Sequence, residues 1–192
     1  MEKFYLEEPS IKRKNEAIEF IDEFYKYGSQ IHGVGGLSSS LKESSYEEWI
    51  NECENMKDNE FAMSRNLAPG VTYFMIRKSD NKIIGMINLR LKLTEFLRNL
   101  GGNIGYSIRP TERKKGYAKI QLYLCLLKAK EYGLENVLVT CADYNEGSRK
   151  TIEALGGIFE KENVNSSDGD VIQLYWIDVN KSINENKNII VS

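Results

Sequence analysis

The 192-residue chain contains little cysteine, proline or histidine, with three Cys, three Pro and one His. Cys53, Cys125 and Cys141 are odd in number and do not have the spacing of metal ligands. They therefore predict free thiols in a reducing compartment rather than a disulfide framework or a zinc site. Cys125 lies inside an apolar stretch and is expected in the core.

The chain also lacks long hydrophobic runs and a strong net charge. No apolar run reaches 18 residues, so no membrane span is expected. The start, Met-Glu-Lys, has no apolar segment after it, which predicts no signal peptide and a cytoplasmic protein. A net charge of −2 gives no general attraction to nucleic acid.

The length and composition fit one soluble domain. Apolar residues make up 41% of the chain and charged residues 28%, which is ordinary for a folded protein with its own core. We expect a single domain over residues 1–180, followed by a polar and loose tail over residues 181–192. No internal repeat is visible.

One cationic turn carries most of the functional information. A predicted strand ends in Tyr106-Ser107-Ile108-Arg109-Pro110, and Arg113-Lys114-Lys115-Gly116-Tyr117-Ala118 follows, ahead of a long apolar helix. The start of a helix presents unpaired backbone N–H groups and the positive end of the helix dipole, and both attract phosphate. Gly116 allows the backbone to approach a phosphate without a Cβ. The alternative is an ordinary solvated turn.

The pattern excludes the two commonest phosphate-binding loops. Its glycine spacing differs from that of a Walker loop, and no Gly-Lys-Ser/Thr follows. The three spaced glycines of a dinucleotide-binding turn are also missing. A phosphate-bearing cofactor of another kind is therefore expected.

The order of the elements after the turn is distinctive. A helix runs from Gly116 to Tyr132, Gly133 ends it, and a short apolar strand covers residues 137–140. Asn145 and Ser148 then open a helix that ends at Leu155-Gly156-Gly157. This arrangement, with Arg-x-x-Gly-x-Ala, resembles the GNAT superfamily of N-acetyltransferases over residues 83–176. It is most similar to a bacterial subgroup of predicted acetyltransferases that shares Gly-x-Ile-Gly-Tyr-Ser-Ile-Arg-Pro.

Hydrophobic periodicity predicts a mixed α/β fold. Helices are expected over 15–27 and 45–58, loops over 31–40 and 60–70, and further strands over 4–6, 71–77, 83–91, 103–108 and 171–179. The resemblance implies the GNAT fold, with helices on both faces of a central, mostly antiparallel twisted sheet. In that fold the strand before the cationic turn bends at a bulge and parts from its parallel neighbour.

The resemblance further implies acetyl-CoA as co-substrate and no metal. The pantetheine arm is expected to pair with the backbone of Tyr106, Ser107 and Ile108, and a backbone N–H near Ile108 to stabilise the oxyanion. Asn145 matches a position that touches this arm, and Ser148 faces the same way one turn later. The diphosphate is expected on the backbone from Arg113 through Lys114, Lys115, Gly116 and Tyr117 to Ala118.

The implied reaction is direct attack of an amine on the thioester, which benefits from a general base and a general acid. Many relatives place a Tyr acid where this chain has Ile152, and relatives in the subgroup often have His where it has Asn103. Glu95 matches a position near the acceptor and is named as the candidate base. A water relayed to a carboxylate or to a backbone carbonyl is an equal alternative.

Other candidates keep two interpretations. His32 is either a base in a loop over the acceptor or an incidental loop residue. Gly33, Gly35 and Gly36 are interpreted as a mobile lid rather than a phosphate cradle, because no strand and helix frame them.

The leading hypothesis is an acetyl-CoA-dependent N-acetyltransferase acting on a primary amine. The acceptor is a small molecule or a peptide. A GNAT-fold module that binds acyl-CoA without transferring the acyl group is the alternative, and an interaction domain using the basic turn alone is a third. Pairing of two copies through edge strands remains open.

Overall fold

The computed structural model describes residues 2–189. Its strands are β1 (Phe4–Glu7), β2 (Gly70–Arg77), β3 (Lys82–Arg90), β4 (Ile104–Ile108), β5 (Asn136–Ala142), β6 (Ile158–Val164) and β7 (Val171–Asp178). Its α-helices are α1 (Lys14–Lys26), α2 (Leu37–Glu43), α3 (Tyr46–Asn55), α4 (Asn59–Ser64), α5 (Tyr117–Glu131), α6 (Glu146–Glu153) and α7 (Val179–Glu185). Short helical turns are η1 (Ile11–Arg13), η2 (Leu97–Gly101), η3 (Pro110–Glu112) and η4 (Lys187–Ile189).

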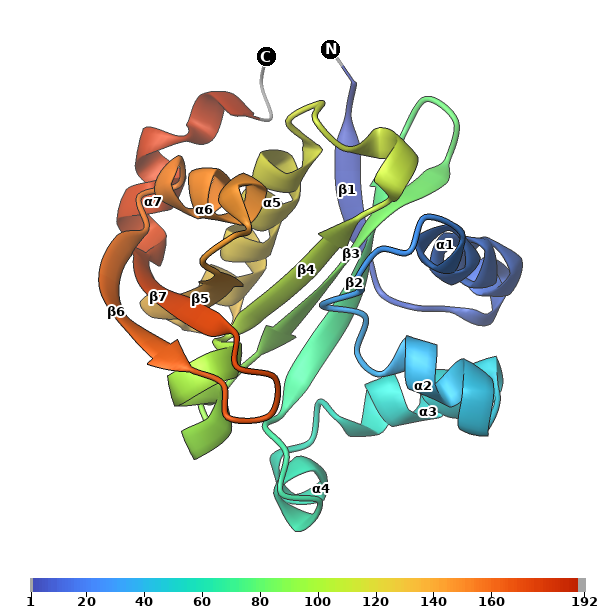
Figure 1. Ribbon diagram of the computed structural model, residues 1–192. Helices are drawn as coiled ribbons and strands as arrows, with labels where there is room; N and C mark the ends of the chain where they lie inside the picture. Colours follow the sequence, from blue (N-terminus) through green and yellow to red (C-terminus); the bar gives the residue numbers. More distant parts are fainter. Residues whose placement is uncertain (1, 190–192) are drawn as a thin grey trace.

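The seven strands form one sheet in the order β1-β2-β3-β4-β5-β7-β6 (Figure 1). Every neighbouring pair is antiparallel except β4 and β5, which are parallel and are connected through α5. The predicted mixed α/β class and mostly antiparallel sheet are confirmed. β1 and β6 are the edge strands, and pairing of two copies through an edge stays a prediction.

The parallel pair separates almost at once. Its register holds a single pair of partners, Ile104 and Val139, and beyond that pair β4 and β5 diverge (Figure 1). The predicted splay is therefore present. The bulge expected with it is absent from the pairing of β3 with β4, which runs without a register shift from Ile104 to Ile108. The backbone of Asn103 still bonds to β5, so the separation begins where that contact ends.

Two apolar clusters hold the helices on the two faces of the sheet. Helices α1 to α3 pack Phe20, Phe24 and Trp49 against β2 and β3. On the other face α5, α6 and α7 cover the central strands. Because α5 has neighbours on several sides, it needs no single polar face, and this explains why its sequence is apolar almost all round.

Two segments expected as loops contain helices. Helix α2 lies in a serine-rich stretch typical of a loop, but it buries Leu37 completely. Helix α4 is capped by Asp58, whose side chain accepts a hydrogen bond from the Phe61 N–H. Burial of Leu37 stabilises α2 and the Asp58 cap stabilises α4, although the composition of both segments is typical of loops.

The segment expected as a loose tail continues as α7, which crosses residue 180 and buries Val179, Ser182 and Ile183 against the molecule. Residues 190–192 of that tail lie outside the described residues. The assignment of residues 1–180 to one domain stays a prediction.

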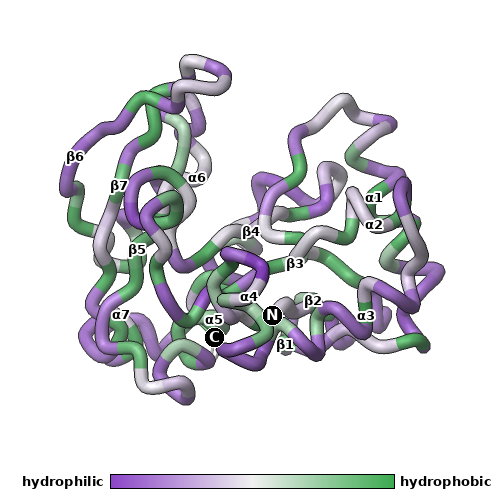
Figure 2. Tube along the Cα trace, turned by 90° about the horizontal axis from the view of Figure 1, so that it is seen from below, coloured by the Kyte–Doolittle hydropathy of each residue, from purple (hydrophilic) through white to green (hydrophobic). Residues whose placement is uncertain are grey.

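Figure 2 shows hydrophobic chain concentrated in the inner strands, whereas β6 at the edge is mostly hydrophilic. Across residues 2–189, the structure contains no helix with the length and apolar character needed to span a membrane.

Candidate active site

The splay between β4 and β5 exposes backbone polar groups of β4. The N–H of Arg109 bonds to the carbonyl of Ile84 in β3. In an antiparallel pair every second residue directs its N–H and carbonyl to the partner strand, so the backbone groups of Ser107 also point at β3. The backbone groups of Tyr106 and Ile108 consequently point toward β5, which has already diverged. Of the three residues expected to offer free backbone groups, the register favours Tyr106 and Ile108, while the backbone of Ser107 belongs to the ladder with β3.

The cationic turn exposes a second set of polar groups. Among the described residues, none accepts a hydrogen bond from the consecutive backbone N–H groups of residues 114–118. Lys114 and Gly116 have φ values of 63° and 79°, and Gly116 is the N-cap of α5. When residues in the left-handed conformation alternate with residues in other conformations, their successive N–H groups face one concave site that binds anions. Here that site lies at the positive end of a helix dipole. A Cβ on Gly116 would meet no protein atom within 4 Å, which leaves this approach open.

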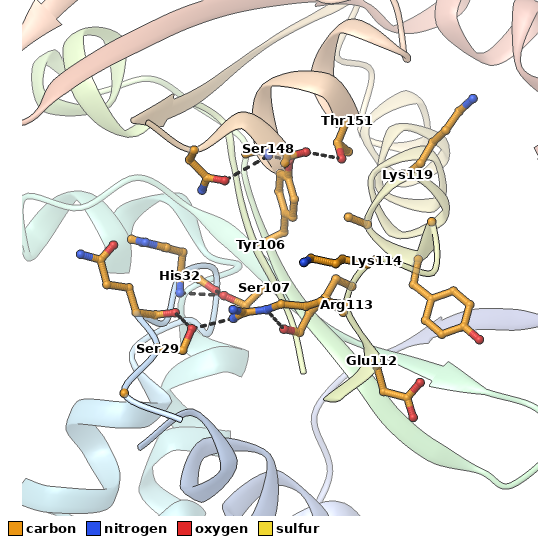
Figure 3. A pocket seen from close by; sticks show the side chains of 18 residues that line it. Ser29, His32, Tyr106, Ser107, Glu112, Arg113, Lys114, Lys119, Ser148 and Thr151 are labelled. Atoms are coloured by element: carbon orange, nitrogen blue, oxygen red, sulfur yellow. Dashed lines mark hydrogen bonds between the residues drawn. The ribbon is translucent and has the colours of Figure 1, made fainter. Parts of the chain in front are cut away.

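A cavity of about 630 Å³ joins these two sets of groups (Figure 3). Tyr106, Ser107 and Ile108 line one part of it, and the start of α5 lines another. Its volume suits a ligand of cofactor size. The predicted residues that line it are Tyr106, Ser107, Ile108, Arg113, Lys114, Gly116, Tyr117, Ala118, Asn145 and Ser148.

The three cations of the turn have different environments. Lys114 extends toward the middle of the cavity (Figure 3). Arg113 is held at the wall, where its Nε donates to the Ile108 carbonyl at 3.1 Å and its Nη2 donates to the Ser29 hydroxyl at 2.7 Å. Lys115 does not line the cavity, and its Nζ pairs with Glu112 at 2.7 Å. Lys119, which the sequence interpretation missed, stands at the cavity edge one turn into α5.

Across the cavity lies the N-terminus of α6. The Asn145 Oδ1 accepts the N–H of Ser148 at 3.1 Å and so caps this helix. The hydroxyls of Tyr106 and Ser148 share a hydrogen bond of 2.8 Å that connects β4 with α6 (Figure 3). Burial raises the pKa of Tyr106 above its ordinary value, although the bond to Ser148 acts in the opposite direction. Tyr106 therefore stays protonated at neutral pH.

His32 reaches the same cavity from the loop after α1. The side chain of Ser107 holds the main chain of His32, accepting its N–H at 2.8 Å and donating to its carbonyl at 2.6 Å. Burial, and then the positive charge of Arg90, lower the pKa of the His32 imidazole below its ordinary value. The imidazole is therefore neutral at physiological pH. A single histidine in a loop carried no pattern from which this placement could be found.

The structure places the other catalytic candidates outside the cavity. Glu95 is exposed, and its side chain lines neither this cavity nor the larger one described below. Asn103 is buried and structural, because its side chain accepts the Leu138 N–H at 2.8 Å and donates to the Arg90 carbonyl at 2.9 Å. Ile152, at the position where many relatives have Tyr, is fully buried in the core.

Comparison with known proteins decides the family. The acetyltransferase (GNAT) domain family matches residues 17–158, most of the chain. The chain belongs to the GNAT acetyltransferase family. The predicted enzyme class, an acyltransferase, is confirmed with it. No curated protein matches the chain in sequence.

Several solved GNAT structures are similar to the fold. The microcin C7 self-immunity acetyltransferase MccE, in complex with acetyl-CoA and AMP, is 16% identical with a TM-score of 0.66, covering 91% of each chain. The ribosomal L7/L12 α-N-protein acetyltransferase RimL, in complex with coenzyme A, is 14% identical with a TM-score of 0.63, covering 92% of this chain and 96% of its own. A chimera of the Vibrio cholerae spermidine N-acetyltransferase SpeG and hSSAT is 15% identical with a TM-score of 0.62, covering 95% and 99%. At these identities the likeness concerns the GNAT fold alone.

Proposed function

We propose that this GNAT protein transfers an acetyl group from acetyl-CoA to a primary amine. The observation that carries the proposal is the row of unpaired N–H groups over residues 114–118, at the start of α5 and at one end of the cavity. Lys114 and Arg113 add positive charge beside this row. Such a group of donors and cations suits the diphosphate of coenzyme A. The solved structures of MccE and RimL, which contain acetyl-CoA and coenzyme A, support the choice of ligand.

The remaining groups support the chemistry at the other end of the cavity. The pantetheine arm would pair with the backbone groups of Tyr106 and with the N–H of Ile108, whose carbonyl is occupied by Arg113, in the manner of an added strand. The N–H of Ile108 would then donate to the thioester oxygen as negative charge develops on it. The cap uses the Oδ1 of Asn145, and no described residue accepts a hydrogen bond from its Nδ2, which would serve as a further donor.

Neutral His32 is the proposed general base, in place of Glu95. An alkyl ammonium group has a pKa near ~10.4, so loss of its proton at neutral pH needs assistance. The ammonium gives one proton to the His32 imidazole, which passes it to solvent. The neutral amine nitrogen then bonds to the carbonyl carbon while the C=O electron pair moves onto the oxygen, and the nitrogen loses its second proton to solvent. The carbon–sulfur bond then breaks, and the thiolate takes a proton from the hydrogen-bonded hydroxyls of Tyr106 and Ser148, which solvent replaces.

Calorimetric titration of the purified protein with acetyl-CoA tests the proposal. We expect binding in the micromolar range and release of free thiol when primary amines are added. A folded protein that does not bind acetyl-CoA contradicts the proposal. The same titration with coenzyme A checks that the diphosphate end, rather than the acetyl group, supplies most of the affinity.

A second candidate function is an acyl-CoA-binding module without transferase activity. The burial of Ile152, where many relatives have a Tyr acid, favours it. Such a module would bind acetyl-CoA normally but would show only slow thioester hydrolysis that no amine accelerates. Amine-dependent thiol release from a broad panel of amines excludes this alternative.

A further inference from the structure

A second cavity, of about 930 Å³, lies on the sheet face covered by α1 to α3. Thr72 of β2, Asn88 and Arg90 of β3, and residues of α2, α3 and η2 line it. The loop 31–36 separates it from the first cavity, since His32 lines the first and Gly35 and Gly36 line the second.

This loop crosses β4 in close contact. A Cβ on Gly33 would lie 2.0 Å from the Gly105 carbonyl oxygen, so only a glycine permits the crossing. The guanidinium of Arg90 lies at the same place, because a Cβ on Gly105 would be 3.3 Å from both its Nη1 and its Nη2. Arg90 therefore borders β4 at Gly105, one residue before Tyr106, whose hydroxyl is the proton donor to the leaving thiolate in the proposed function.

Arg90 differs from most other arginines of the chain in lacking an acidic partner. Those with a carboxylate within 4 Å are Arg13, Arg65, Arg77, Arg98, Arg109 and Arg149. Among the described residues, Arg90 and Arg113 have none. Arg113 lines the cavity proposed for the cofactor diphosphate, which leaves Arg90 as the unmatched cation of the second cavity.

The hydrogen bonds of Arg90 leave one edge of its guanidinium free. Its Nη1 donates to the carbonyls of Gly101 at 3.0 Å and Gly102 at 3.3 Å. No residue of the described chain accepts a hydrogen bond from its Nε or Nη2. The edge formed by these two nitrogens matches a carboxylate or a phosphate in bidentate geometry. Burial lowers the pKa of Arg90, and among the described residues no carboxylate within 4 Å opposes that effect.

We propose that Arg90 forms an anion-binding subsite in the acceptor cavity, so that the acceptor is an amine that also carries a carboxylate or phosphate group. The anion would stay on the free edge of Arg90, and the amine would reach the thioester beside the loop, through the gap where β4 and β5 diverge. This inference rests on the proposed function. The alternative acceptor is a polycation, which would contact Glu43 and Glu48 at the rim of the cavity. Both carboxylates are exposed, and an acidic cluster alone does not define a site.

The experiment compares matched amines in the thiol-release assay. The pairs are β-alanine with β-alaninamide, glycine with glycinamide, and phosphoethanolamine with ethanolamine, and spermidine represents the polycations. We expect kcat/KM to be about ten- to hundredfold higher for the anionic member of at least one pair. The identity of that pair distinguishes a carboxylate from a phosphate acceptor.

Variants assign the preference to Arg90. Arg90→Gln should abolish it through a higher KM and leave acetyl-CoA affinity unchanged, and Arg90→Lys should restore part of it. Arg65→Gln is the matched control, because Arg65 lines the same cavity but is paired with Glu52. It should keep the preference.

Each contrary outcome is distinct. A wild-type protein that does not bind acetyl-CoA refutes the proposed function itself. A protein that binds acetyl-CoA but prefers neutral amines or spermidine, or acetylates no anionic amine of the set, refutes the anion subsite alone. Retention of the anionic preference in Arg90→Gln does the same.

Discussion

The Ser107 side chain bonds to both the N–H and the carbonyl of His32, at 2.8 Å and 2.6 Å, and so fixes the loop 31–36 to β4 like an additional strand partner. The bond joins residues 75 positions apart in the sequence. Because the His32 imidazole is proposed as the base, Ser107 becomes a positioning residue for it. Ser107 also lines the cofactor cavity, so one residue contacts both the proposed cofactor site and the loop that carries the proposed base.

The first prediction concerns this support. Ser107→Ala should lower kcat and reduce the free energy of unfolding by about 1–2 kcal/mol, since two hydrogen bonds of a buried hydroxyl are lost. Acetyl-CoA affinity should change little, because the diphosphate site at the start of α5 is untouched. If Ser107 acts through His32, the kcat of the double variant with His32→Gln should equal that of His32→Gln alone. Additive losses of kcat would contradict that role.

The second prediction concerns pH. Burial and Arg90 hold the pKa of His32 below its ordinary value of about 6.5, so the base is neutral above that pH and becomes protonated only in acid. The wild-type kcat/KM should therefore fall as pH decreases through a value below about 6.5. His32→Gln should have lower activity and should lack this limb of the profile.

The titration of His32 can be measured directly, because it is the only histidine in the chain. Its NMR signals need no assignment. Arg90→Gln removes the neighbouring positive charge and should raise the pKa of His32, whereas Arg65→Gln should not. An unchanged pKa in Arg90→Gln would show that the two side chains are not electrostatically coupled.

The sequence interpretation named most of the residues that line the first cavity but few of those that line the second. The turn from Arg113 to Ala118 is local: a strand, a cationic bend and a helix N-terminus follow one another, and the chemistry can be inferred from neighbouring residues. The side chain of Lys115 is an exception, because its Nζ pairs with Glu112, a carboxylate that Arg77 of the distant strand β2 also contacts.

The acceptor half is assembled from distant segments. The sequence left His32 with two interpretations, and it reaches the cofactor cavity because the loop crosses β4 at Gly105. Arg90 is an unmatched cation because no carboxylate of the described residues forms an ion pair with it. Neither fact has a local pattern. Likewise, Asn103 was interpreted as the position of a missing His base. Its side chain instead hydrogen-bonds to the backbone of β3 and to the backbone of β5, and so bridges the two strands.

The third prediction tests the diphosphate site with two glycines of the same helix. Gly116 and Gly133, before and after α5, have φ values of 79° and 75°, and a Cβ on either would meet no protein atom within 4 Å. Alanine at either position should reduce the free energy of unfolding by about 1–2 kcal/mol through left-handed strain. Only Gly116→Ala should also weaken acetyl-CoA binding, because only there does the Cβ face the ligand. Equal acetyl-CoA affinity in the two variants would argue against the diphosphate assignment.

The fourth prediction concerns the support of the turn by α1. Glu23 accepts hydrogen bonds from the Thr111 N–H at 2.9 Å, from its hydroxyl at 2.8 Å and from the Arg109 Nη1 at 2.8 Å. Burial on its own would raise the pKa of Glu23, but these donors outweigh it and the pKa is lowered. Stability from a carboxylate with a lowered pKa is present above the unfolded value of about 4.3 and is lost as pH falls through the folded value.

Glu23→Gln should therefore reduce the free energy of unfolding at pH 7 by about 1–3 kcal/mol, with the difference shrinking in acid below the unfolded pKa of about 4.3. Glu19→Gln is the matched control, because Glu19 bonds to the same Arg109 at 3.0 Å but leaves 64% of its side chain exposed. That substitution should change stability by less than about 1 kcal/mol. Urea unfolding of the three proteins at pH 7 and pH 3 measures both effects. If Glu23→Gln lost the same stability at both pH values, packing rather than the ionised carboxylate would hold α1 against the cofactor turn.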